Sequence, residues 1–192
     1  MTNDLNTALI GAKKKRKRGE PKAKRRMREA FLQIRAHKDL EEITVTELCR
    51  RADINKSTFY GYYHNIYELS DALQSEVIQQ IIDSMDDPSE ICTDVSSFAY
   101  RMLANCRPNH EIIQTLFSGS QSNKLPEKMD EVIKKLFYSI KPQHLGDLHH
   151  AVMLSYKIYG SYYAYIMNTG FDPEERMRYI AELDGSFATH DV

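Results

Sequence analysis

The sequence predicts an all-α protein, with an N-terminal three-helix helix-turn-helix domain, a C-terminal helical bundle and about nine helices in all. Three observations support this fold class. Apolar residues recur at helical spacing along most of the chain. No stretch alternates apolar and polar residues over a useful strand length. Breaks rich in Gly, Pro, Asn and Ser divide the chain into segments of helix length.

The predicted N-terminal domain covers residues 21–70 and follows an arm of residues 1–20. The arm has little apolar surface to bury and repels itself electrostatically, so we expect it to be disordered in isolation. Pro21 suits the first turn of a helix that ends near residues 37–38. Met27, Phe31 and Ile34 fall on one face of this helix, which predicts that the face is buried.

Two short helices joined by a tight turn follow. Thr44 and Glu47 form a capping box for the first, over residues 45–52. Asp53 is expected to end it in the left-handed conformation. Asn55 is expected to cap the second, which runs through about residue 62. This is a helix-turn-helix arrangement.

The rest of the chain, residues 71–192, is predicted to be a second, helical domain. Asn65 caps a long helix that begins in the first domain and stops before Asp86-Asp87-Pro88. Further breaks separate the remaining helices. The predicted ranges are 66–85, 92–106, 109–118, 125–140, 144–168 and 173–186.

The second short helix has an unusual free side. Phe59 and Tyr63 are expected to face inward. A lysine and short hydroxyls at a helix N-terminus suit contact with phosphate, because the helix dipole and free backbone N–H groups point there. A helical hairpin inside a bundle would explain Phe59 but not the crowding of polar side chains. Those on the free side are Lys56, Ser57, Thr58, Tyr60 and Tyr62.

Residues 25–73 resemble the DNA-binding domain of TetR-type bacterial transcription regulators. The resemblance is carried by Thr44, Ala52, Thr58-Phe59-Tyr60, Tyr62-Tyr63 and Leu69. It implies a homodimeric repressor that binds a pseudo-palindromic operator in double-stranded DNA and is released by a small-molecule effector. It also implies that residues 71–192 are a dimerisation and ligand-sensing domain. The alternative is a regulator controlled by a partner protein. Two positions depart from the pattern, since Asp53 stands for the usual Gly and Ile66 for a phosphate-contacting Lys.

The DNA contacts expected from this reading fall into two groups. Thr44, Thr46, Tyr60 and Tyr62 are predicted to hold phosphates. Lys56, Ser57 and Thr58 are predicted to reach base edges in the major groove.

The N-terminal arm carries most of the positive charge. Residues 1–28 hold eleven Lys/Arg against two acids, a net charge of +9, while residues 29–192 have a net charge of -10. Residues 29–71 are themselves net negative, so DNA affinity needs positive charge from elsewhere. We therefore predict that the arm binds DNA, following phosphates or entering the minor groove, in preference to nuclear import or membrane-surface binding. Its predicted contacts are Lys13, Lys14, Lys15, Arg16, Lys17, Arg18 and Lys22.

The predicted helix over 144–168 is apolar nearly all round, which indicates burial on both sides. One side can pack within the subunit and the other against a second copy, so we predict a homodimer through the C-terminal helices. A pocket for a small organic molecule is the second expectation for this domain, although its residues could equally fill an ordinary core. The candidate lining is Tyr100, Met102, Met153, Tyr156 and Tyr159.

Other chemistry has little support. His144, Asp147, His149 and His150 lack a metal-binding pattern and are interpreted as solvated residues at a helix start. The chain has no phosphate-binding Gly-rich loop, nucleophile motif or convincing acid pair, so we expect no catalytic residues, no cofactor and no metal; an enzyme on a helical bundle is the competing class. The longest uncharged stretch, 158–171, is too short to span a bilayer, and a cytoplasmic protein without membrane association is expected.

Overall fold

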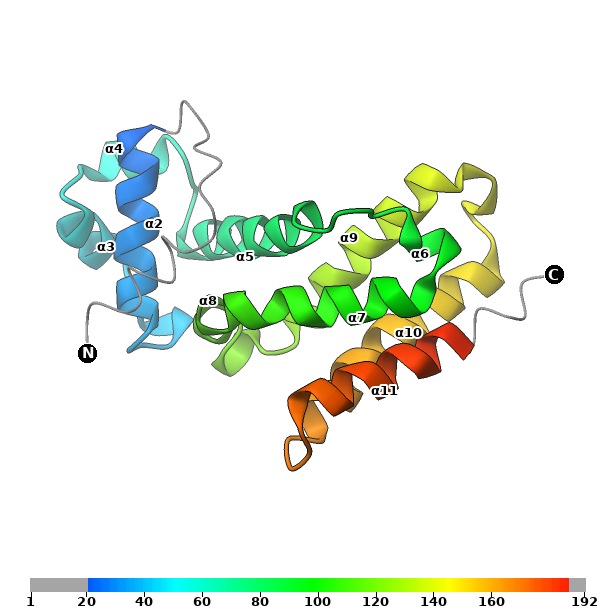
Figure 1. Ribbon diagram of the computed structural model, residues 1–192. Coiled ribbons are helices and arrows are strands. Elements are labelled where there is room, and N and C mark those ends of the chain that lie inside the picture. The colour runs from blue at the N-terminus through cyan, green and yellow to red at the C-terminus, as the bar shows by residue number, and fades with distance from the viewer. Residues whose placement is uncertain (1–20, 187–192) are drawn as a thin grey trace. The chain divides into compact units, whose positions relative to one another are not determined.

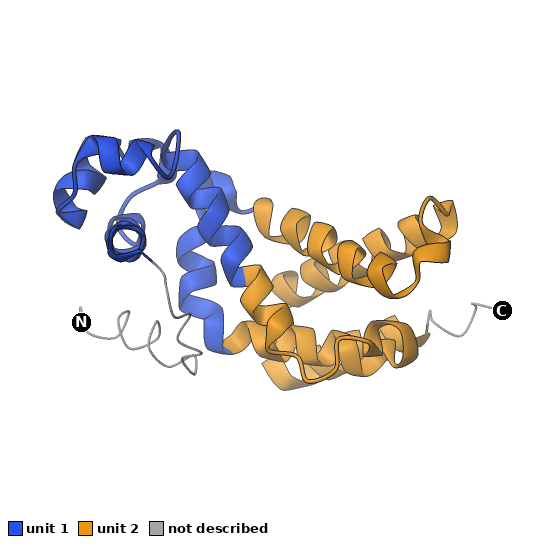
Figure 2. Cartoon of the chain, turned by 90° about the horizontal axis from the view of Figure 1, so that it is seen from above, with its two compact units in different colours: residues 1–77, 108–123 blue, residues 78–107, 124–192 orange. Residues whose placement is uncertain are grey.

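The computed structural model describes residues 21–186 of the 192-residue chain. These residues form helices and connecting turns, with no strand among them, so the predicted all-α class is confirmed (Figure 1). The predicted basic cluster Lys13–Arg18 lies outside the described residues. Within the described part, the chain forms two compact units, coloured separately in Figure 2. Unit 1 contains residues 21–77 and 108–123, and unit 2 contains residues 78–107 and 124–186.

Unit 1 combines the helix-turn-helix region with a segment from the middle of the chain. Its apolar centre forms because α2 buries the face predicted from its spacing, including Met27, Phe31 and Ile34. Leu48 and Phe59 from the two short helices are fully buried in the same unit. The elements are α2 (Lys22–Arg35), η1 (Leu40–Glu42), α3 (Val45–Ala52), α4 (Lys56–Tyr60), the first part of α5 (Ile66–Asp83), α8 (His110–Leu116) and η3 (Gly119–Gln121).

A buried arginine links the mid-chain segment to α2. The Arg35 guanidinium donates to the carbonyl oxygens of Lys38 and Ser118, both at 2.8 Å. It also lies 3.7 Å from the Asp39 carboxylate. A buried charge is tolerated only when it is paired and hydrogen-bonded, so these partners must stay in place for unit 1 to close.

A buried glutamine makes a second link within unit 1. The Gln74 side-chain nitrogen donates to the Leu116 carbonyl at 3.0 Å and lies 3.3 Å from the Gln121 side-chain oxygen. Together, Arg35 and Gln74 satisfy backbone carbonyls of the α8–η3 segment with side chains from α2 and α5. Sequence patterns did not predict this grouping, because the segment is separated from α2 by more than seventy residues.

Unit 2 is a bundle in which α11 packs along α7, and α10 packs against α9 and α11. Its core includes Ile78 and Ile81 of α5, Phe98 of α7, Ile158 of α10 and Met177 of α11. The remaining elements are α6 (Glu90–Thr93), α7 (Val95–Cys106), α9 (Lys124–Ile140), η4 (Pro142–His144), α10 (Leu148–Met167) and α11 (Pro173–Ser186), while η2 (Arg107–Asn109) spans the division between the two units.

Several helix boundaries differ from the sequence expectation. The predicted helix over 92–106 is wrong at its start, because Asp94 leaves the helical conformation, ends α6 and caps α7 by accepting from the Ser97 N–H at 3.0 Å. The predicted start of α10 at residue 144 is wrong because Gly146, at φ +85°, separates η4 from Leu148. The division between the compact units falls inside α5, after Val77. The predicted domain boundary lies earlier, at residues 70–71.

Replacing Gly119 by Ala is expected to lower the free energy of unfolding by more than the same change at Gly146. Both glycines have positive φ, at +56° and +85°, which costs an alanine about 1–2 kcal/mol. At Gly119 an added Cβ would also lie 2.7 Å from Asp39 Oδ1, whereas at Gly146 it would meet nothing within 4 Å. Urea unfolding of the two variants measures the difference. Equal losses would show that Asp39 can move away from Arg35 without cost.

Candidate nucleic-acid interface

The turn between α3 and α4 has the geometry of a helix-turn-helix. Thr44 caps α3 by accepting from the Glu47 N–H at 3.1 Å, which is the Thr44 half of the predicted capping box. The Glu47 carboxylate pairs with Lys38 at 2.8 Å. Asp53 adopts the left-handed conformation at φ 52° and ψ 55°, which confirms the predicted end of α3. Helix α4 begins three residues after Asp53, at Lys56, and its N-cap residue is Asn55 as predicted, but the Asn55 side chain makes no capping hydrogen bond.

Arg26 compensates for the aspartate that occupies this turn. Its guanidinium lies 3.2 Å from both the carbonyl oxygen and a carboxylate oxygen of Asp53. A glycine at this position would adopt the left-handed conformation without strain and would add no negative charge. Because Asp53 occupies this position instead, its negative charge is compensated by the Arg26 guanidinium of α2.

Helix α4 presents polar side chains because its single large apolar residue is buried. Phe59 is fully buried, and Tyr63 is buried beside it with the ring centroids 6.0 Å apart. Tyr60 is 55% exposed and packs edge-on against Phe59 at 5.5 Å. Tyr62 is 41% exposed and lies 6.4 Å from Tyr63, centroid to centroid. The two exposed hydroxyl-bearing rings are therefore held by packing against two buried ones.

The other residues predicted to contact DNA lie at helix starts. Thr44 and Thr46 are exposed at the start of α3, and Lys56 and Ser57 are exposed at the start of α4. Thr58 is only half-buried, and Lys22 is exposed at the start of α2. The Nζ charge of Lys56 acts on the Cys49 thiol of α3, although burial dominates and raises the pKa of that thiol. Free N–H groups at these helix starts favour anions.

The start of α5 offers a further candidate DNA contact, Tyr67, that the sequence patterns did not indicate. Ile66, which stands where the resembling family has a lysine, is buried. Tyr67 beside it is 53% exposed in the first turn of a capped helix. The Glu68 N–H donates to Asn65 Oδ1 at 2.9 Å, and the Glu68 carboxylate accepts from the His64 N–H. Helical spacing alone indicates that residue 66 is buried, because this position lies on the same face of α5 as Leu69 and Leu73.

Several cations of unit 1 are already paired with acids. Arg28 lies 2.7 Å from Glu76, and Arg25 lies 3.9 Å from Glu29. Arg51 donates to the neutral side chain of Gln33 at 2.9 Å. Part of the positive charge of α2 is therefore already compensated by acids, whereas Arg51 of α3 has a neutral partner.

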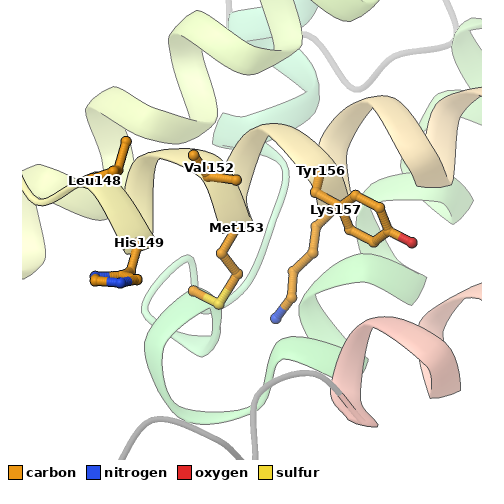
Figure 3. Close-up of a pocket in the computed structure, with 6 residues that line it drawn as sticks. All are labelled: Leu148, His149, Val152, Met153, Tyr156 and Lys157. Atoms are coloured by element: carbon orange, nitrogen blue, oxygen red, sulfur yellow. The ribbon is translucent and has the colours of Figure 1, made fainter.

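The five candidate ligand-binding residues do not all line one site. A hollow of about 470 Å³ with mainly apolar walls opens along α10, and it is lined by Leu148, His149, Val152, Met153, Tyr156 and Lys157 (Figure 3). Of the five predicted residues, only Met153 and Tyr156 line it. Met102 is buried, and Tyr100 donates to Glu174 of α11. Tyr159 is half-buried.

The histidine cluster at the start of α10 is partly packed. His149 is solvated as expected, but the interpretation is wrong for His150, whose ring stacks on His144 with centroids 3.9 Å apart. Asp147 accepts from the His150 backbone N–H and lies 2.9 Å from its ring nitrogen, and these contacts lower the pKa of Asp147 to about 2. Over residues 21–186, no group of three or more His, Cys, Asp or Glu side chains is placed to hold a metal ion.

Comparison with known proteins gives three findings. No family model matches the chain. An uncharacterized HTH-type transcriptional regulator of Bacillus subtilis (strain 168), YxbF, is 29% identical over 94 residues, which make up 47% of this chain and 25% of that protein. The chain thus matches only about a quarter of the length of this curated relative.

The solved structure of the dihydroxyacetone kinase operon activator DhaS is similar, with a TM-score of 0.56 and 16% identity. The match covers 87% of this chain and 96% of that one. At this identity the likeness establishes the fold alone, which agrees with the all-helical arrangement described above. Among the described helices, none has both the length and the apolar character needed to cross a membrane.

Proposed function

We propose that this protein is a DNA-binding transcription regulator of the TetR type. The observation that carries the proposal is the arrangement of α3 and α4, in which Asp53 makes the tight turn and buried Phe59 turns Tyr60 outward. The similarity to a regulator named as HTH-type supports the same conclusion, as does the fold shared with an operon activator. Both names describe regulators, which supports a role in binding rather than catalysis.

In the proposed complex, α4 enters the major groove. Lys56, Ser57 and Thr58 at its N-terminus reach base edges, where lysine and hydroxyl groups can read donor and acceptor patterns. Thr44 and Thr46 of α3 hold phosphates together with Tyr60 and Tyr62. In a two-fold dimer the two α4 helices would lie in successive major grooves about 34–36 Å apart, which requires a pseudo-palindromic operator.

The dimer is proposed to form through α10 and α11. Leu154 and Ile158 of α10 are buried within unit 2, so one side of this helix already packs in its own subunit. The opposite side leaves large apolar residues exposed. An exposed apolar patch of this size is uncommon on the surface of a monomer. A Cβ added at Gly160 would meet nothing within 4 Å, so a second helix could approach closely there. The exposed residues are Leu148, Val152, Tyr156, Tyr163 and Ile166 of α10 and Tyr179 and Leu183 of α11.

We further propose that the protein is a repressor released by a small molecule. The hollow along α10 supports a small ligand, because its volume and apolar walls suit an organic molecule. Release requires that the ligand bind more tightly to the form that cannot bind DNA. One observation favours the alternative of control by a partner protein, namely that this hollow is open along α10 and not enclosed.

Replacing both Tyr60 and Tyr62 by Ala is expected to weaken operator binding at least tenfold, because the variant lacks two exposed hydroxyl donors next to α4. The operator would first be selected from random DNA, and affinity would then be measured by fluorescence anisotropy. The matched Phe variants keep the rings and remove only the hydroxyls, so they should lose most of the same affinity. Unchanged binding by a folded Ala variant would refute this docking model.

Replacing Val152 by Glu is expected to raise the dimer dissociation constant by roughly 100-fold or more, because an unpaired carboxylate would be buried between subunits. Sedimentation velocity over a range of concentrations gives this constant. Lys135→Glu is the matched control, since Lys135 is exposed on α9 and lies outside the proposed contact face. A Val152→Glu protein that remained as strongly dimeric as the control would place the interface elsewhere.

Removing residues 1–18 is expected to weaken specific and nonspecific DNA binding alike, because the arm supplies positive charge that the net-negative module lacks. The plot of log affinity against log salt concentration should flatten by about 0.9 for each phosphate that the arm no longer neutralises. Anisotropy titrations at several salt concentrations, with full-length and truncated protein, measure both slopes. Identical slopes would show that the arm does not touch DNA.

A further inference from the structure

The start of α5 lacks the cation that the resembling family uses to contact a phosphate. Ile66 occupies that position, is buried and carries no charge. An exposed cation elsewhere on the helix-turn-helix surface can supply the same attraction, because the electrostatic part of DNA affinity depends on how many phosphates are neutralised. Arg50, in the last turn of α3, is exposed and is such a cation.

Arg50 lies on the side of α3 that already carries a predicted DNA contact. Residues four apart in a helix share a face, so Arg50 follows Thr46 along the exposed side of α3. From Arg50 the chain passes through the left-handed turn at Asp53 and begins α4 at Lys56. Arg50 therefore comes between the threonine proposed to hold a phosphate and the lysine proposed to reach base edges.

The two acids nearest to Arg50 in α3 and its turn are held by other cations. Glu47, three residues before Arg50, lies 2.8 Å from Lys38 Nζ. Asp53, three residues after it, lies 3.2 Å from a terminal guanidinium nitrogen of Arg26. Positions three apart on a helix are those from which an acid can pair with an arginine. Within residues 21–186, the Arg50 guanidinium makes no hydrogen bond or ion pair of its own.

The neighbouring Arg51 has a different environment. Its Nε donates to the side-chain oxygen of Gln33 at 2.9 Å, so Arg51 is directed towards α2. Both arginines lie in the last turn of α3, where positive charge stabilises the C-terminal end of a helix. The two side chains therefore make the same contribution to the helix end, but Arg50 alone remains available for an external anion.

We propose that Arg50 binds a phosphate of the DNA backbone, and that Arg26 and Lys38 keep it available by holding Asp53 and Glu47. The planar guanidinium can donate two parallel hydrogen bonds to one phosphate. A phosphate contact carries no base information, so Arg50 strengthens binding to every sequence alike. This inference rests on the proposed DNA-binding function and adds to it a contact that Ile66 cannot make.

The test compares Arg50→Gln with Arg51→Gln in the full-length protein, using anisotropy titrations over a series of salt concentrations. Two duplexes of equal length are used, the selected operator and a random sequence. Arg50→Gln is expected to flatten the plot of log affinity against log salt by about 0.9 for each subunit, and to weaken binding to both duplexes roughly threefold to tenfold. Arg51→Gln loses the same charge at the helix end and should keep the wild-type slope. Arg50→Lys keeps the charge and should retain most of it.

A second measurement tests the role of Arg26. Arg26→Gln leaves the Asp53 carboxylate without its partner, so that Asp53 can pair with Arg50. The loss of DNA affinity on Arg26→Gln is therefore expected to be roughly threefold larger in the protein with Arg50 than in the Arg50→Gln protein, which a double-mutant cycle measures. Independent effects of the two substitutions would overturn the role proposed for Arg26.

The salt series also separates this contact from the proposed function. DNA binding by a folded Arg50→Gln protein with the wild-type slope would refute the contact and retain the regulator. A loss of affinity confined to the operator would show that Arg50 reads bases, which would also overturn the phosphate assignment. A wild-type protein that binds neither duplex would refute the regulator and the contact together.

Discussion

Burial of Phe59 is the interaction on which the presented surface of unit 1 depends. Helix α4 has five residues, and a helix of that length has no stability of its own in water. Its position is set by one fully buried ring and by the left-handed turn at Asp53. Because Phe59 points inward, helical geometry turns Tyr60 outward. The same anchor therefore serves stability and recognition, and the aromatic neighbours Tyr60 and Tyr63 pack directly on it.

In unit 1, the arginines in ion pairs hold structural elements in place, and other cations must supply the attraction to a polyanion. Arg26 and Arg28 form ion pairs with Asp53 and Glu76, so they hold the turn and α5 in place and add little net positive charge to the surface. Buried Arg35 joins α2 to the α8–η3 segment through the Ser118 carbonyl. Long-range attraction to a polyanion then depends on cations outside these pairs, which the sequence concentrates before residue 19.

Helix α10 combines two kinds of surface that are usually separate. Its inner side contributes Leu154 and Ile158 to the core of unit 2. Its outer side leaves Val152 and Tyr156 exposed, and the hollow that they line reaches Lys157. A ligand bound there would contact the same helix that we propose as the dimer contact. Changes in ligand occupancy and in subunit packing would then be coupled through one helix, without a separate transmitting element.

The sequence by itself determined the all-helical class, the caps at Thr44 and Asn65, and the inward direction of Phe59, because these follow from local spacing and backbone chemistry. It also indicated which side chains of α4 stay outside. Only the tertiary structure decided that residues 108–123 pack with unit 1, that Met102 is a core residue, and that Lys157 borders a hollow. These outcomes depend on contacts between segments far apart in the chain, such as Arg35 with Ser118 and Ser161 with Asp184. Periodicity reports which face of a helix is apolar, but it carries no information about which distant segment will cover that face.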